Sequence, residues 1–297
     1  MKVKLIALFL ITVGLSWIAI SIAHAQSSSV TIVPQSSFYA GVGGSYNSVN
    51  FGAQNVYAVG TSNNYTNNVL TSSGSAWGPT SVNMGKQTAW APTLQAGYFQ
   101  YIADTHYLWG AKVTYSYLGA NSTVQNANIP QVGNYYYPSS NKNVSFVGNA
   151  VANSYQTTMN NQLQLMPFFG HSFNKGFAYI GGGPTISQVK TNINNLVGYA
   201  TINGVNTNIS GAPQSFSSSS WVYGAAALVG ATYFLSPSWF LDLSYTYTQT
   251  NNQIGNYSSA FSNPANSSGA SSSGTLVGNS SGKVLTQSIA LTINKSF

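Results

Sequence analysis

The stretch Ser288-Ile289-Ala290-Leu291-Thr292-Ile293-Asn294-Lys295-Ser296-Phe297 alternates between two kinds of side chain. Every second residue, counted back from the end, is large and mostly apolar: Phe297, Lys295, Ile293, Leu291 and Ile289. The residues between them are small or polar. Successive side chains of a β-strand point to opposite faces. The stretch therefore predicts a strand with one apolar face, interrupted at Lys295, and one polar face.

Seven further blocks of the chain show an aromatic-rich alternation of the same kind. The eight blocks are 38–46, 90–100, 107–118, 155–170, 177–190, 221–235, 239–250 and 284–297. Each is long enough to cross a bilayer as a tilted strand, for which about 9–11 residues suffice. The blocks therefore predict eight membrane-crossing strands.

The connections between these blocks alternate in length. Three are short turns rich in breakers, namely 101–106, 171–176 and 236–238. Four are long, namely 47–89, 119–154, 191–220 and 251–283. An even number of strands with short turns on one side and long loops on the other is typical of outer-membrane barrels. Within the third long connection, Asn203-Gly204 predicts a hairpin standing above the membrane.

Three segments carry a family resemblance. Residues 236–247 are similar to the penultimate strand of eight-stranded outer-membrane barrels of the OmpA-transmembrane and opacity-protein type, and 38–44 resembles their first strand. Residues Ile289, Leu291, Ile293 and Phe297 resemble the closing-strand signal that the assembly machinery of such barrels reads. The resemblance implies an all-β fold: a transmembrane antiparallel up-and-down barrel of eight strands with long extracellular loops. The length of the chain would also serve ten or twelve strands.

The first 25 residues predict export. Lys2 and Lys4 precede an apolar stretch over 5–22, and Ala23-His24-Ala25 supplies a cleavage site. An uncleaved membrane anchor is the alternative reading. We expect a cleaved signal peptide over 1–25, a short lead over 26–37, and a barrel over 38–297 in the outer membrane of a Gram-negative bacterium.

Composition narrows the possible functions. Charged residues are 4% of the chain, against about 25% in ordinary soluble domains. Arg and Glu are absent, so the Arg and Glu networks that fill related barrels cannot be carried over. The lysines are scattered, which argues against nucleic acid as a partner. The chain has no cysteine, which excludes disulfides and thiolate chemistry.

Two charged residues are predicted to face the barrel lumen. Because Trp239 and Trp109 are expected to face lipid, Asp242 and Lys112, each three residues further on, face inward. A buried charge without a partner is costly, so we expect a lumenal Lys112–Asp242 ion pair. Two separately hydrated charges are the alternative. Six aromatic residues are expected in the interfacial girdles: Tyr107, Trp109, Trp239, Tyr233, Tyr245 and Tyr247.

The sequence predicts a protein that is not an enzyme. Outer-membrane proteases need several acids, and the chain has only Asp104 and Asp242. The histidines His106 and His171 fall at predicted turns on the periplasmic side, far from the loops. No His, Asp, Glu or Cys residues cluster in the sequence, so no metal site and no cofactor are expected.

The function expected from these features is structural and surface-exposed. The long segments combine Tyr with Ser, Gly and Asn, a composition suited to adaptable contacts. They predict loops that mediate adhesion or contact with host or envelope components. Expected partners are outer-membrane lipid and lipopolysaccharide, the assembly machinery, and a host or surface ligand. The alternative function is a small porin or channel for small solutes.

Overall fold

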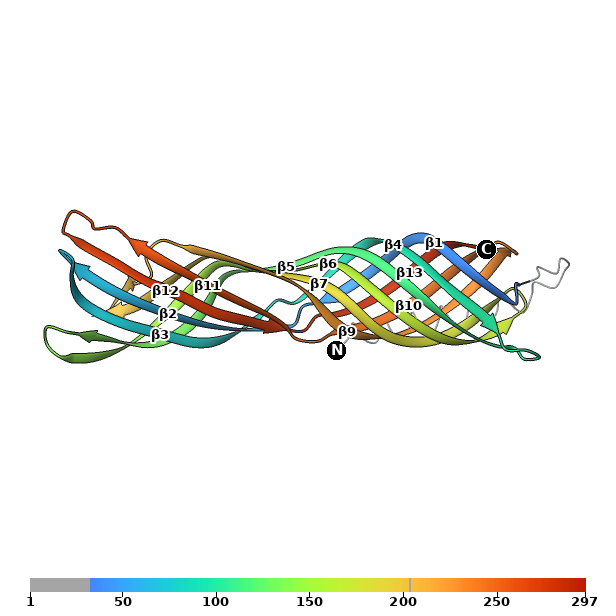
Figure 1. The fold of residues 1–297 in the computed structure, drawn as a ribbon, viewed down its shortest axis with the longest axis horizontal. Helices are drawn as coiled ribbons and strands as arrows, with labels where there is room; N and C mark the ends of the chain where they lie inside the picture. The colour runs from blue at the N-terminus through green and yellow to red at the C-terminus, as the bar shows by residue number, and fades with distance from the viewer. Residues whose placement is uncertain (1–32, 203) are drawn as a thin grey trace. The chain divides into compact units, whose positions relative to one another are not determined.

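The structure is a computed structural model that describes residues 33–202 and 204–297. The predicted signal peptide over 1–25 lies outside the described residues, as does the lead up to residue 32. Within the described residues the chain forms 13 strands in one antiparallel sheet (Figure 1). No helix in this part of the chain is long and apolar enough to cross a membrane. The strands are β1 (Ser36–Asn50), β2 (Ala53–Thr66), β3 (Val69–Asn83), β4 (Lys86–Tyr101), β5 (Tyr107–Tyr137), β6 (Lys142–Phe173), β7 (Gly176–Ile202), β8 (Val205–Asn208), β9 (Gln214–Ser236), β10 (Trp239–Thr250), β11 (Gln253–Asn263), β12 (Ala270–Gly282) and β13 (Leu285–Ser296).

Eight of these strands close into a barrel, which we call the proximal barrel. Its order is β1-β4-β5-β6-β7-β9-β10-β13, and the pairing of β13 with β1 closes it. These are the eight blocks predicted from the alternation, joined by the three short turns at one end, which we call the turn end. The predicted antiparallel up-and-down barrel of eight strands is therefore confirmed.

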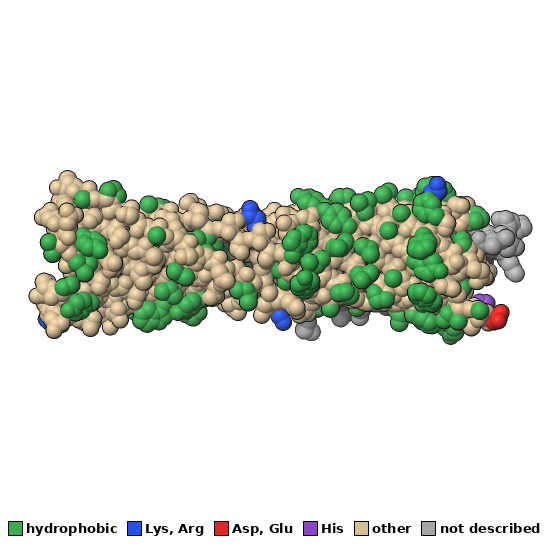
Figure 2. All heavy atoms as spheres, viewed as in Figure 1, with side chains coloured by type: hydrophobic (Ala, Val, Ile, Leu, Met, Phe, Trp, Pro, Cys, Tyr) green, Lys and Arg blue, Asp and Glu red, His purple; other side chains and the backbone are tan. Residues whose placement is uncertain are grey.

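The proximal barrel exposes many large apolar side chains on its outer wall. On β13, Leu291 is 53% exposed and Ile293 is also exposed, whereas Thr292 and Asn294 between them are buried. The neighbouring β10 follows the same rule, because Trp239 and Leu243 are exposed while Phe240 and Asp242 are buried. The right half of Figure 2 shows the outward hydrophobic side chains over these strands and over β4.

The four long connections are also strands, which the sequence analysis did not predict. They continue the proximal strands into a second barrel, the distal barrel, in which β2, β3, β11 and β12 extend β1, β4, β10 and β13. The strands β5, β6, β7 and β9 run through both barrels; β5 alone has 31 residues. Since a transmembrane strand needs about 9–11 residues, these strands reach far beyond the thickness of a bilayer.

Two matched Asn-x-Gly motifs mark the junction between the barrels. Gly52 and Gly85 have positive φ of 60° and 71°, a backbone conformation that glycine adopts without steric cost. The amide of Phe51 donates to Gly85 O at 3.0 Å, and the amide of Met84 donates to Gly52 O at 2.9 Å. The segment that links β1 to β2 therefore stays hydrogen-bonded to the segment that links β3 to β4. The side chains of Phe51 and Met84 point into the lumen, where both are buried.

The distal barrel closes through backbone pairing and through side chains. The strands β12 and β2 pair along their length, and β3 pairs with β5 over residues 73–77. Between β9 and β11 the rings of Phe216 and Tyr257 lie 4.8 Å apart, and Ser259 Oγ donates to Gln214 Oε1 at 3.1 Å. Side-chain packing thus joins the last pair of distal strands.

The tips of the distal barrel are hairpins. At the β2–β3 tip, Asn67 and Asn68 have φ of 47° and 64°, and two consecutive positive φ values fit a type I′ turn. On either side of the predicted Asn203-Gly204 turn, β8 pairs back on β7, with Ile202 opposite Val205; Asn203 itself lies outside the described residues.

Candidate functional site

The lumen of the proximal barrel holds a charged cluster at its centre. Lys112 on β5 and Asp242 on β10 lie on opposite walls of the barrel, and Lys112 Nζ is 3.0 Å from Asp242 Oδ2. Both side chains are at most 4% exposed. The structure therefore brings together the two residues expected to pair, in a direct contact that spans the lumen.

Three neutral side chains complete this cluster. Tyr179 on β7 accepts a hydrogen bond from Lys112 Nζ at 2.8 Å and donates its hydroxyl to Asp242 Oδ1 at 2.6 Å. Gln95 on β4 donates to Asp242 Oδ2 at 3.0 Å and to Asn294 Oδ1 at 2.7 Å. Five of the eight proximal strands therefore contribute a side chain to one network. None of Gln95, Tyr179 and Asn294 was predicted as a partner, because alternation gives the face of a residue but not its neighbours across the lumen.

The network satisfies the buried carboxylate of Asp242. Its two oxygens accept hydrogen bonds from Lys112, Gln95 and Tyr179. Hydrogen bonds to charged groups are stronger than neutral ones, and buried ion pairs are tolerated when their remaining lone pairs are satisfied. Because its members come from separate strands, the cluster ties distant parts of the wall together.

An aromatic cluster fills the lumen at the turn end. The rings of Phe99 and Phe177 lie 5.3 Å apart, and those of Phe234 and Phe240 lie 4.9 Å apart. Leu108, Met166, Phe168 and Leu228 pack in the same cluster, all of them buried. This packing closes the lumen between the charged network and the turn end.

A second apolar cluster fills the lumen at the junction and beyond. It includes Val49, Phe51, Met84, Leu118 and Met159, all with 4% exposure or less. Between the two apolar clusters the lumen is polar, with contacts such as Gln164 Nε2 to Thr248 Oγ1 at 3.0 Å. The space left in this polar layer admits about one water molecule. The lumen is thus a packed interior.

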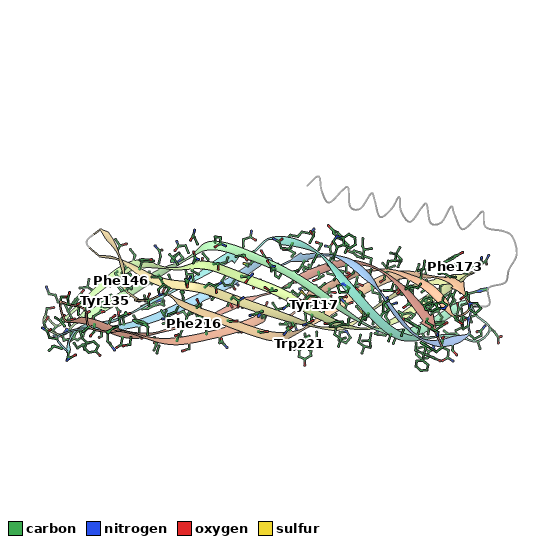
Figure 3. All side chains as sticks on the ribbon, turned by 90° about the horizontal axis from the view of Figure 1, so that it is seen from above. Tyr117, Tyr135, Phe146, Phe173, Phe216 and Trp221 are labelled. Atoms are coloured by element: carbon green, nitrogen blue, oxygen red, sulfur yellow. The ribbon has the colours of Figure 1, made fainter. Side chains whose placement is uncertain are left out.

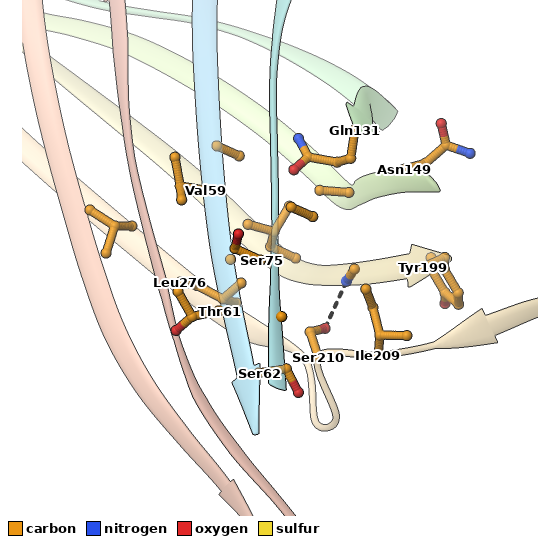
Figure 4. A pocket seen from close by; sticks show the side chains of 18 of the residues that line it. Val59, Thr61, Ser62, Ser75, Gln131, Asn149, Tyr199, Ile209, Ser210 and Leu276 are labelled. Carbon is orange, nitrogen blue, oxygen red and sulfur yellow. Dashed lines mark hydrogen bonds between the residues drawn. The ribbon is translucent and has the colours of Figure 1, made fainter. Parts of the chain in front are cut away.

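Another small cavity lies in the distal barrel (Figure 4). Leu196, Phe261 and Leu276 line it, and the linker between β8 and β9 closes one side, where Gly198 N donates to Ser210 Oγ at 2.7 Å. Burial raises the pKa of Tyr257, another lining residue, well above its usual value. The cavity has room for only a few water-sized molecules, too little for an organic ligand of ordinary size.

The tyrosines of the distal segments divide between the two faces. Tyr57 and Tyr136 are exposed, as expected for contact residues. Tyr135 lies in the segment 119–154 that was predicted to be a surface loop, but it is buried and stacks on Phe146 with ring centroids 5.1 Å apart. Figure 3 shows both rings in the distal half of the sheet. The reason is parity, because residue 135 lies on the inner face of β5, between the outward residues 134 and 136.

The residues expected in the girdles lie on the outer wall at two heights. Tyr107, Trp109, Tyr233 and Trp239 lie towards the turn end and are exposed. Tyr247 is exposed and Tyr245 is half-buried, both further along β10 towards the junction. Trp90, at 79% exposure, contacts Tyr46 there with ring centroids 5.0 Å apart. Figure 3 shows Tyr117 and Trp221 at about this height, near the middle of the long strands.

The residues of the expected assembly signal all lie on one strand face. Ile289, Leu291, Ile293 and Phe297 are exposed on the outer wall. The strand β13 pairs with β1 on one side and β10 on the other. Recognition of this face by an assembly machinery stays a prediction.

Among the described residues, His106 and His171 are the histidines, and both lie at the turn end, away from the distal barrel. The rings of His106 and His171 are 5.9 Å apart, and Tyr107 packs edge-on against His171. Asp104 lies in the exposed turn before them. Within residues 33–202 and 204–297, no three His, Cys, Asp or Glu side chains come close enough to hold a metal ion.

Gly230 gives the charged network the room it needs. A Cβ placed on Gly230 would collide with the ring of Tyr179, the residue that links Lys112 to Asp242. We expect Gly230→Val to lower the free energy of unfolding by about 1–3 kcal/mol, the usual cost of overpacking a core. Urea unfolding of the refolded protein measures this. Ala227→Val, on the outward face of the same strand, is the matched control and should leave the midpoint unchanged.

No protein-family model and no curated protein matches the sequence. Several solved structures show a distant similarity. Neisserial surface protein A is 10% identical over 82% of this chain and 97% of its own, with a TM-score of 0.29. OprG from Pseudomonas aeruginosa is 9% identical over 91% and 99%, with a TM-score of 0.34. The attachment invasion locus protein Ail of Yersinia pestis is 10% identical over 81% and 98%, with a TM-score of 0.23. The function therefore has to be argued from the residues of this chain.

Proposed function

We propose that this chain is an outer-membrane surface protein whose proximal barrel spans the membrane and whose distal barrel projects from the cell. The observation that carries the proposal is that the proximal barrel exposes large apolar side chains and buries charged ones, the reverse of the arrangement in a soluble protein. Leu291, Ile293 and Leu243 face outward, while Lys112 and Asp242 are buried inside. A bilayer favours this arrangement, because it solvates apolar side chains and leaves the polar ones to the lumen.

The two levels of outward aromatic residues support the same placement. Trp and Tyr side chains favour the two interfaces of a membrane, where one end of the ring is apolar and the other is hydrated. Trp109 and Trp239 would mark the periplasmic interface, and Trp90 and Tyr46 the outer interface. The short turns then lie in the periplasm and the distal barrel lies outside.

A closed lumen argues for a surface role over a channel. Phe99, Phe177 and their neighbours fill one end of the proximal lumen, and Phe51 and Met84 fill the other. A solute or ion would have to displace both clusters and break the Lys112–Asp242 contact. We infer that the protein acts through its outer surface, with no catalytic step.

The distal barrel suits adhesion or contact with host or envelope components. It is a paired sheet, so it presents its side chains on a rigid support, which reduces the entropy lost on binding. Its outer face carries Tyr57 and Tyr136 among Ser, Thr and Asn residues. Lipopolysaccharide would surround the base of this barrel, and the assembly machinery would act on β13 during biogenesis.

We expect the purified protein to form no stable pores in a planar lipid bilayer. The two apolar clusters leave no continuous water path, so recordings should show only baseline current. Insertion must be shown separately, by cofloating the protein with vesicles and by its resistance to extraction at high pH. Steady, reproducible conductance steps from inserted protein would contradict the surface role and favour a small channel.

A further inference from the structure

The distal barrel carries an apolar row on its outer wall. The row crosses five neighbouring strands in register: Val277 faces Val59, Val59 faces Trp77, Trp77 faces Val132, and Val132 faces Val147. Trp77, at the centre, is 39% exposed, and Val132 and Val147 are more exposed still. Figure 2 shows hydrophobic side chains grouped over β3 in its left half.

A second row widens this surface on the side of the junction. Tyr57 and Pro79 face each other on β2 and β3, and Pro130 lies two residues before Val132 on β5. All three side chains are exposed. We call these eight residues the lateral patch: Tyr57, Val59, Trp77, Pro79, Pro130, Val132, Val147 and Val277.

The lateral patch is an island on the distal wall. The next row towards the tips holds Thr61, Ser75 and Asn134, and the next row towards the junction holds Asn55, Ser81 and Asn128. These neutral polar rows separate the patch from the girdle around Trp90. Exposed apolar patches with a polar rim commonly mark interaction sites.

We propose that the lateral patch binds the same patch on a second copy of this chain in the same membrane. This inference rests on the proposed membrane placement. The patch points sideways from the barrel wall, so its partner must stand beside the barrel at the same height. A second copy, inserted to the same depth, meets that requirement by geometry and forms an isologous contact about a two-fold axis along the membrane normal.

The size and charge of the lateral patch fit a second copy of this chain as the partner. It exposes on the order of a few hundred Å², less than the roughly 800 Å² per partner of a stable complex formed from free solution. Two copies in one membrane have already lost most of their rotational freedom, so a smaller contact suffices. No Lys or Asp lies in the patch or in the two rows that border it. Two copies can therefore meet without repulsion between like charges.

Single cysteines test this contact, because the chain has none of its own. The test variant is Val132→Cys, at a residue of the lateral patch. The control variant is Ser217→Cys, at an exposed residue of β9 on the opposite wall of the distal barrel. Both variants are expressed in the outer membrane of whole cells and treated with a thiol cross-linker of short span. We expect most of the Val132→Cys protein to run as a covalent dimer and the Ser217→Cys protein to run as a monomer. Adding Trp77→Ser should reduce the dimer several-fold, whereas Ile254→Ser, at an exposed apolar residue outside the patch, should not.

Labelling of the same cysteines separates the two proposals. A membrane-impermeant maleimide should label both variants on intact cells. Labelling without a dimer at Val132→Cys overturns the lateral contact and leaves the surface placement standing. If the cysteines are labelled only after detergent lysis, both the lateral contact and the surface placement are wrong. Equal dimer yields from the two variants, or a cross-linked product with the mass of a different protein, also overturn the proposed contact.

Discussion

We expect Asp242→Asn to lower the free energy of unfolding by about 3–5 kcal/mol, the cost of leaving one charge of a buried pair without its partner. In that variant Lys112 Nζ would keep its hydrogen bond to Tyr179 but lose the carboxylate at 3.0 Å. Lys112→Met should cost a similar amount, because it removes the cation that pairs with the buried carboxyl group of Asp242. Urea unfolding in lipid vesicles, followed by Trp fluorescence, measures both changes.

The double variant shows whether the two residues act as a pair. Lys112→Met combined with Asp242→Asn should cost less than the sum of the two single changes, by about 0.5–3 kcal/mol. Asp104→Asn is the matched control, because Asp104 is the other acid of the chain and lies in an exposed turn. Single costs that add within about 0.5 kcal/mol would show that the contact contributes no stability of its own.

The sequence predicted the proximal barrel well because the two faces of its strands differ strongly in polarity. On β10 and β13 the outward residues are mostly large and apolar, with Lys295 as an exception, and the inward residues are mostly small or polar. That contrast survives at every second position, so the strands and their faces could be read directly. The same parity placed Lys112 and Asp242 in the lumen. Their places on the third and seventh of eight strands put them on opposite walls.

The distal barrel escaped prediction because the two faces of its strands differ much less in polarity. On β2 the outward face holds Asn55, Tyr57 and Val59, while the inward face holds Gln54, Val56 and Ser62. Neither face is clearly apolar, so the segment has the composition of a loop. What makes it a strand is pairing with β3 and β12, which no local pattern reveals. The strand register that brings the residues of the lateral patch together cannot be predicted from the sequence for the same reason.

The cluster around Asp242 shows a similar limit. Gln95 contacts both Asp242 and Asn294, and this double contact depends on the stagger of the strands around the barrel. Tyr179 reaches the cluster because the neighbouring strand has a glycine at position 230, where its ring needs space. Alternation along one strand carries no information about either relation.

Arginine substitutions should locate the membrane on the barrel wall. Leu243 and Leu291 face each other on β10 and β13, about midway along the proximal strands, and both are exposed. An Arg on the lipid-facing side of a barrel costs about 2–4 kcal/mol at the bilayer midplane and about 0–1 kcal/mol near the interfaces. We therefore expect Leu243→Arg and Leu291→Arg each to lower the free energy of unfolding in vesicles by about 2–4 kcal/mol.

Val277 on the distal wall provides the comparison. Its side chain is exposed and apolar, so Val277→Arg makes the same kind of change outside the proposed membrane. In water the guanidinium stays hydrated, and the cost should stay below about 1 kcal/mol, as for most surface substitutions. A high lipid-to-protein ratio keeps contacts between copies from affecting the result. Both positions are exposed and apolar and lie on the same sheet, so the proposed difference in membrane depth is what should distinguish them. Equal losses of unfolding free energy for Val277→Arg and Leu291→Arg would therefore contradict the placement of the bilayer around the proximal barrel.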